Sequence, residues 1–255
     1  MLTIRYCIFI LLFCPLISAG QVITYFGSSS NPADNGSLGA ATVAVTPPAS
    51  MEEGDLVLMI GLRRASSITL TVSATGGQTW NELPVLTGTT NVSPRIFWCR
   101  FNGTWDTDPS VAMTASSTNT VVMHVFRPPS RGYSWAVAVD QVSTAAAAAA
   151  TITQTGVTTT QDNTITLAAW FTADDNRWGN LVDVSGTGWT VTGLAQYRNR
   201  QGTDHSCTFA HLIQTTAGAT GNVSKQQTAN GNDAARTAIV SFYPYRTSMP
   251  LGLLY

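Results

Sequence analysis

The sequence predicts an all-β protein, a two-sheet antiparallel β-sandwich of jelly-roll type built from two weakly similar halves. Threonine is abundant, with 37 residues in 255, and Thr, Val and aromatic residues suit a pleated sheet. Glu occurs three times and Lys once, although both commonly cover helix surfaces. No window keeps the 3.6-residue apolar period of a helix, whereas short apolar or alternating segments recur between turn residues.

Six strands are expected in the first half. The segment 55–62 (DLVLMIGL) is almost wholly apolar, which is typical of a strand buried on both faces. The segment 67–73 (SITLTVS) alternates between apolar and polar residues, as a strand with one buried face does. The expected strands are 41–46, 55–62, 67–73, 95–101, 110–115 and 120–126.

The pattern restarts after Pro128 and Pro129, and five further strands are expected. They are 134–142, 164–171, 189–194, 208–213 and 237–243. The alanine run 145–150 has high helix propensity, but Thr144 and Thr151 flank it. We therefore expect a loop or an edge strand there.

The two sets of strands indicate an internal duplication with half-repeats at about 41–128 and 134–244. Trp80 and Trp189 are 109 residues apart, and Cys99 and Cys207 are 108 apart. The last strand is shifted by 117, so the second half carries an insertion. Each half would need cover for an apolar face, so we expect both halves to form one sandwich. The alternative is two small sandwiches joined at 128–133.

The N-terminal residues 1–19 have the layout of a secretory signal peptide. Arg5 precedes an apolar run from Cys7 to Ile17, and the small residues Ser18 and Ala19 follow. We expect cleavage after Ala19 or Gly20, secretion of the mature chain, and no membrane span after cleavage. An uncleaved anchor is the alternative. The mature protein then consists of a β-sandwich at 20–246 and an apolar tail at 247–255.

Composition excludes one class of partner. Charged residues make up 11% of the chain and the formal net charge is −1. A nucleic-acid surface needs clustered Lys and Arg, so we expect no nucleic-acid partner.

The mature chain contains two cysteines, Cys99 and Cys207. Phe97, Cys99 and Phe101 share one apolar strand face, and Cys207 alternates with Phe209 in the same way. An even cysteine count in an exported chain favours pairing, so we expect a disulfide. Two separate buried thiols are the alternative.

Turn and core signals carry a resemblance over about 22–244. They are 156–164 (GVTTTQDNT), Gly188-Trp189-Thr190, 216–221 (TAGATG) and the strand ending at Pro244, with Pro47-Pro48 and 53–56 (EGDL) upstream. The chain resembles a loosely defined, mostly uncharacterised group of duplicated β-sandwich proteins from bacteriophages, prophages and secreted bacterial proteins. The resemblance implies a structural or surface-recognition module. The signal peptide departs from a virion protein and favours a cellular, extracellular role.

One group of oxygen ligands predicts a calcium site. Asp174, Asp175, Asn176 and Asp183 lie within ten residues, and Ca²⁺ takes six to eight oxygen ligands. The spacing matches no EF-hand. No other cofactor is expected, and the chain contains no motif for a phosphate loop or a catalytic nucleophile.

A zinc site is a weaker alternative on another strand. His205, Cys207 and His211 share strand parity, and Cys99 or His124 would have to complete the four ligands.

Trp105 and Trp178 stand in polar, loop-like surroundings. Exposed there, their rings could stack on sugars and bind glycans or a cell surface. The alternative is that both rings plug the ends of the sandwich.

The function expected first is a non-enzymatic secreted structural subunit of an extracellular assembly, such as a filament, sheath or surface layer. Low charge and a single lysine favour self-association into a homopolymer. The alternatives are a secreted glycan- or cell-surface-binding module and, on scattered Asp residues alone, a secreted hydrolase.

Two segments are expected to make the assembly contacts. The mature N-terminus, 21–26, could add a strand to a neighbour, and the apolar tail could fill a groove on it. The residues in question are Gln21, Val22, Ile23, Met249, Leu251, Leu253, Leu254 and Tyr255. The tail could equally dock on its own sandwich.

Overall fold

The computed structural model describes residues 22–65, 69–73, 75–86, 91–113, 118–229 and 231–246. These residues form seventeen β-strands and one short 3₁₀ helix, Thr75–Gly77. Every pairing between strands is antiparallel, so the predicted all-β antiparallel class is confirmed. None of the helices in the described residues has the length and hydropathy needed to span a membrane.

The N-terminal half contains two sheets. The large N-terminal sheet has the order β1 (Thr24–Asn31), β8 (Asn119–Arg127), β3 (Leu56–Arg63), β6 (Ser93–Arg100) and β5 (Asn81–Glu82). The small N-terminal sheet has the order β2 (Thr42–Ala44), β7 (Ser110–Met113) and β4 (Leu70–Val72).

The C-terminal half also contains two sheets. The large C-terminal sheet has the order β13 (Thr190–Val191), β15 (His205–Gln214), β11 (Thr164–Thr172), β17 (Ala235–Arg246) and β9 (Tyr133–Ala146), and β14 (Tyr197–Asn199) also pairs with β15. The small C-terminal sheet has the order β10 (Thr151–Gln154), β16 (Val223–Ala229) and β12 (Arg177–Asp183).

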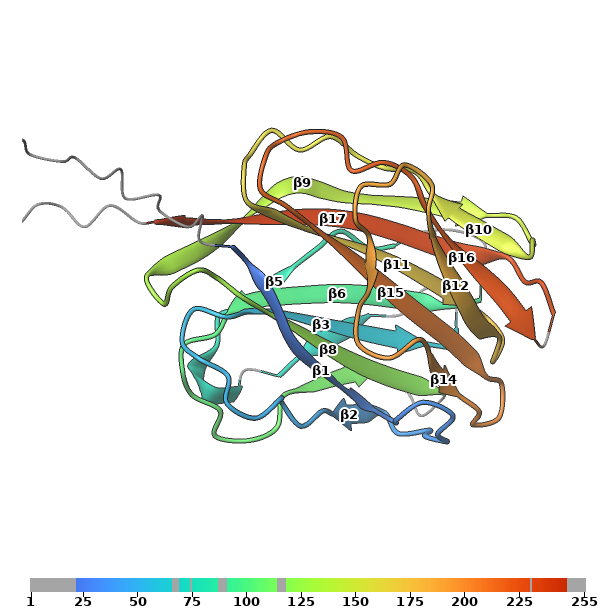
Figure 1. Cartoon of the computed structure of the whole chain (residues 1–255). Coiled ribbons are helices and arrows are strands. Elements are labelled where there is room, and N and C mark those ends of the chain that lie inside the picture. The colour runs from blue at the N-terminus through green and yellow to red at the C-terminus, as the bar shows by residue number, and fades with distance from the viewer. Residues whose placement is uncertain are drawn as a thin grey trace, which may run out of the picture.

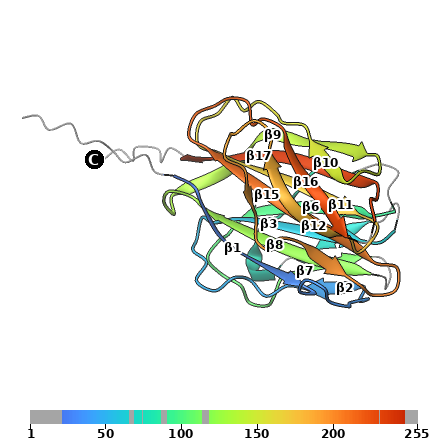
Figure 2. The same ribbon diagram turned by 45° about the vertical axis from the view of Figure 1, so that its right-hand side comes forward.

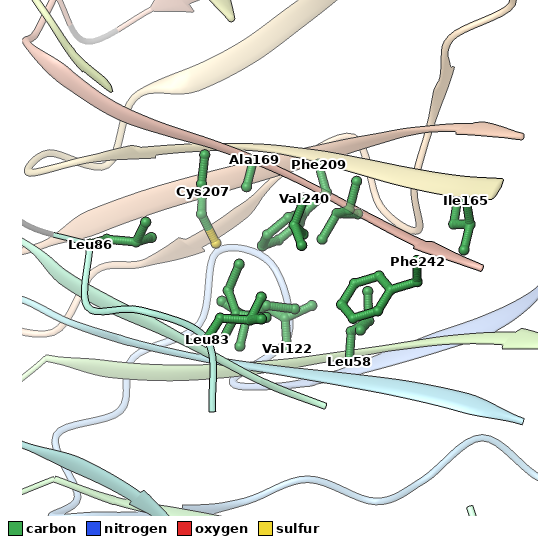
Figure 3. Packing of buried hydrophobic residues seen from close by; sticks show 14 of the residues in the cluster. Leu58, Leu83, Leu86, Val122, Ile165, Ala169, Cys207, Phe209, Val240 and Phe242 are labelled. Carbon is green, nitrogen blue, oxygen red and sulfur yellow. The ribbon is translucent and has the colours of Figure 1, made fainter. Parts of the chain in front are cut away.

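The four sheets stack as four layers, with the large sheets in the middle (Figures 1 and 2). The central core joins the two large sheets, with Leu58 and Val122 facing Phe209, Val240 and Phe242 (Figure 3). Two outer cores lie between each large sheet and its small sheet. The prediction of a single two-sheet sandwich is therefore too simple, because each half has two sheets of its own.

Strand β3 shows why the central sheets read as continuous apolar runs. Leu56, Leu58 and Ile60 belong to the central core, whereas Val57 and Met59 belong to the outer core under the small N-terminal sheet. Successive side chains of a strand point to opposite faces, so a sheet covered on both faces needs apolar residues at every position. The nine residues predicted for the core are all buried: Leu56, Leu58, Ile60, Phe97, Phe101, Val122, Leu167, Ile239 and Phe242.

The internal duplication extends to every strand of the first half. The order β1-β8-β3-β6-β5 recurs as β9-β17-β11-β15-β13, and β2-β7-β4 recurs as β10-β16-β12. The equivalent pairs Val43 and Ile152, Val72 and Leu181, and Asn81 and Thr190 are each 109 residues apart. Asn81 pairs with Trp98 and Thr190 with His211, so the offset becomes 113. Four extra residues in the segment that contains β14 account for this change. The jelly-roll connection stays a prediction.

The sequence missed several strands. Strands β12 and β16 lack a clear alternation, because β16 (VSKQQTA) places Lys225 and Gln227 on its buried face. Residues 145 and 146 end the edge strand β9, and the rest of the alanine run is loop, as expected.

Candidate functional site

The clearest cluster of ionisable groups is formed by Asp174, Asp175 and Asp204, whose ligand oxygens lie within 4.8 Å of one another. Asp174 and Asp175 follow β11 and Asp204 precedes β15, and the pairing of Thr172 with Ser206 brings these ends together. Burial, and then the charges of Asp174 and Asp175, raise the pKa of Asp204. The Arg200 guanidinium contacts Asp175 at 3.0 Å and balances part of the charge.

Three carboxylates are a suitable partial ligand set for a hard cation such as Ca²⁺. Calcium binding at this end of the large C-terminal sheet stays a prediction. Asp204 was missed because 29 residues separate it from Asp175, and only strand pairing joins them.

The other two residues of the predicted calcium group lie elsewhere. Asn176 is buried, and its Nδ2 donates to Gln227 and, at 2.8 Å, to Asp233 Oδ2. Asp183 accepts hydrogen bonds from the backbone N–H groups of Gly188 (2.6 Å) and Trp189 (3.1 Å). Including Asn176 and Asp183 in one site with Asp174 was therefore wrong, because each stabilises local structure of its own.

The tryptophans chosen as sugar platforms are largely covered. Trp178 is 3% exposed, lies in the outer core of the second half and donates its Nε1–H to Ser206 Oγ at 2.9 Å. Trp105 is half-buried and stacks on Phe101 with ring centroids 5.0 Å apart. The alternative reading, in which both rings close the ends of the fold, is the one that the structure favours.

Cys99 and Cys207 are free buried thiols, so the predicted disulfide is not formed. Cys99 belongs to the outer core under the small N-terminal sheet, whereas Cys207 belongs to the central core. The four-residue insertion explains the error, because it makes Leu212, and not Cys207, the equivalent of Cys99. Burial raises the pKa of both thiols, which keeps them protonated and unreactive.

All three histidines lie where the two large sheets meet. His124 packs edge-on against Phe209 at 4.7 Å, His205 Nε2 contacts Thr120 Oγ1 at 2.8 Å, and the His211 ring stacks on Tyr25 at 5.3 Å. Burial lowers the pKa of His124 and His205 to about 3 and that of His211 to about 4. The zinc hypothesis for His205, Cys207 and His211 was wrong, because among the described residues only the aspartate cluster gathers three such ligands.

A polar cavity of about 230 Å³ lies at the junction of the two halves. Its lining includes Arg127, which holds Asp55 through Nε–Oδ1 and Nη2–Oδ2 contacts of 3.0 Å each. Arg131 Nε contacts Glu52 Oε2 at 3.0 Å. These paired charges fasten the loop before β3 to the segment that joins the halves, a structural task.

Strand β9 forms one edge of the large C-terminal sheet and pairs only with β17 among the described residues. It is fourteen residues long and carries one charge, Asp140. A long sheet edge presents unpaired N–H and C=O groups, which are a template for another strand. Sequence reasoning expected 134–142 as a strand but not its position at an edge.

The predicted assembly residues fall into two groups. Val22 is exposed, but Ile23 is buried in the central core and Thr24 begins β1, which pairs with β8 of the same chain. The use of 21–26 as a strand donor was therefore wrong, because that segment already completes its own sheet. Gln21, Met249, Leu251, Leu253, Leu254 and Tyr255 lie outside the described residues, as does the predicted signal peptide.

Comparison of the chain with protein-family models, with curated proteins and with solved structures found no match.

Proposed function

We propose that the protein is a non-enzymatic, secreted structural subunit of an extracellular assembly, in which copies join through sheet edges. The observation that carries this proposal is the free edge of β9, with fourteen residues and a single charge. Soluble monomers usually protect such edges with several charges, prolines or a covering loop.

The charges of the protein support the same function. Six arginines are held in ion pairs with carboxylates of the same chain: Arg95, Arg100, Arg127, Arg131, Arg198 and Arg200. Lys225, the single lysine, is 1% exposed. Little charge is left to keep copies apart, and a net charge near zero promotes association.

Exposed apolar side chains gather near the same edge. Val142 on β9 is 46% exposed, and Val85 is 54% exposed beside Pro84, whose carbonyl accepts a hydrogen bond from Gln141 of β9. A contact at this edge would remove both valines from water, at about 25 cal/mol for each Å² buried.

Negative-stain electron microscopy of the mature chain, starting at residue 20, tests the function. Regular polymers or sheets are expected as concentration rises. Monodisperse single particles at every concentration, together with binding to a glycan array, would instead identify a binding module.

A further inference from the structure

We infer that the occupant of the β9 edge is the C-terminal segment 247–255 of a second copy, added as a new strand beside residues 142–146. This inference rests on the proposed function and names the contact that would build the assembly. It gives every copy one donor segment and one acceptor edge, and such head-to-tail contacts extend into open chains.

The duplication contains two equivalent edges, and only one is open. The end of β1 is fastened to the β14 segment, because Arg198 Nε contacts Asp34 Oδ1 at 3.1 Å and Gly36 forms a bridge with Asn199. The β14 segment is the insertion of the second half, so the first half has no counterpart of it to cover β9. Figure 1 shows β9 at the outer rim of its sheet, with β17 on its inner side.

The edge of β9 is regular at its C-terminal end. Its register with β17 shifts twice between Val142 and Val137, and these bulges surround Asp140. Beyond them, residues 142–146 pair one for one with β17, from Val142 with Ile239 to Ala146 with Ala235. This stretch is uncharged, so an incoming strand would meet a straight ladder there.

The C-terminal segment TSMPLGLLY has the pattern of an edge strand. Met249, Leu251, Leu253 and Tyr255 alternate, so an extended chain would place all four on one face. Pro250 has no N–H, and proline in a sheet is confined largely to edge strands with that side facing solvent. The apolar residues on either side of Pro250 would then direct their N–H groups toward β9.

Chain length excludes the donor's own edge. β17 ends at Arg246, which pairs with Tyr133 at the opposite end of β9 from residues 142–146. Nine strand residues separate Tyr133 from Val142, a distance of about 30 Å. The nine residues 247–255 span about 30 Å when fully extended, so a chain would use its whole tail merely to reach its own Val142. A second copy has no such limit.

Two charge variants of the full mature chain test the inference. Val142→Lys blocks the acceptor edge, and the double variant Leu251→Lys with Leu253→Lys blocks the donor segment. Val182→Lys is the matched control, since Val182 is an exposed valine on β12, the edge of the small C-terminal sheet. Protection of Cys99 and Cys207 from a thiol reagent verifies that each variant is folded.

Sedimentation velocity should show polymers for the wild type and for Val182→Lys, and monomers for the acceptor and donor variants alone. An equimolar mixture of those two variants should form a 1:1 complex and grow no further, because only one good donor meets one good acceptor. If both folded variants polymerise like the wild type, or if their mixture stays monomeric, the inference is wrong while the proposed function stands. A wild type that remains monomeric at high concentration contradicts the proposed function itself.

Discussion

Lys225 occupies in the second half the position that Val111 occupies in the first. Val111 pairs with Val43 and Val72, and Lys225 pairs with their equivalents Ile152 and Leu181. The chain thus places its single lysine on the buried face of the small C-terminal sheet, where the other half has an ordinary core residue.

Lys225→Val should stabilise the protein at neutral pH. Burial lowers the pKa of Lys225 from 10.5 to about 8, so between these values the unfolded state binds more protons and wild-type stability rises with pH. The variant should gain about 1 to 4 kcal/mol at pH 7, and its advantage should shrink from pH 8 to pH 10.5. Urea unfolding at pH 7 and pH 10 measures both effects, with Val111→Lys as the destabilised control. Equal stability of wild type and variant at pH 7 would refute the prediction.

The buried histidines should make the fold sensitive to mild acid. Their pKa values fall from 6.5 to about 3 or 4, so below pH 6.5 the unfolded state takes up protons that the folded state refuses. Stability should fall as pH drops from 6.5 toward 4, by up to about 4 kcal/mol per pH unit for three groups. His124→Phe should reduce this slope by about one third. Unfolding free energies that stay constant from pH 6.5 to 4.5 would contradict the assignment.

Both cysteines should react only after unfolding. They are buried on different faces of the large N-terminal sheet, so neither a bond between them nor contact with solvent is available in the fold. A thiol reagent should label no cysteine of the native mature chain and two in urea. Recovery of a linked Cys99–Cys207 peptide by non-reducing mapping would overturn this account.

Gly193→Ala should destabilise the protein far more than Gly202→Ala. Both glycines have positive φ, 70° and 57°, so both alanines carry the left-handed penalty of about 1 kcal/mol. A Cβ at Gly193 would also meet the Tyr197 hydroxyl and lie 2.7 Å from Ser28 Oγ, whereas nothing lies within 4 Å at Gly202. Thermal unfolding should show an extra loss of about 1 to 3 kcal/mol for Gly193→Ala. Similar losses at both positions would show that this close contact carries no weight.

The sequence predicted the inner strands well because burial on both faces leaves a strong signal. The apolar run 55–62 and the nine predicted core residues illustrate this. Strand β16 escaped notice because Lys225 and Gln227 stand where apolar residues would mark a buried face.

The four-layer arrangement needed knowledge of register. The 108-residue spacing of Cys99 and Cys207 suggested equivalent places, but the insertion around β14 shifts β15 by four residues and sends the two thiols to different cores. Similarly, Asp204 joins Asp174 and Asp175 only through the pairing of β11 with β15. Patterns within a strand identify its faces, whereas pairings between distant strands follow from the whole fold.

Amide hydrogen exchange on the assembled and the monomeric protein tests most directly the central claim that copies join through the edge of β9. The backbone N–H groups of residues 142–146 that point away from β17 should exchange more slowly in the assembly, because the strand of a second copy accepts their hydrogen bonds. Strand β12, also an edge, should exchange at the same rate in both states. Unchanged exchange along β9, with protection appearing at another strand instead, would contradict the account.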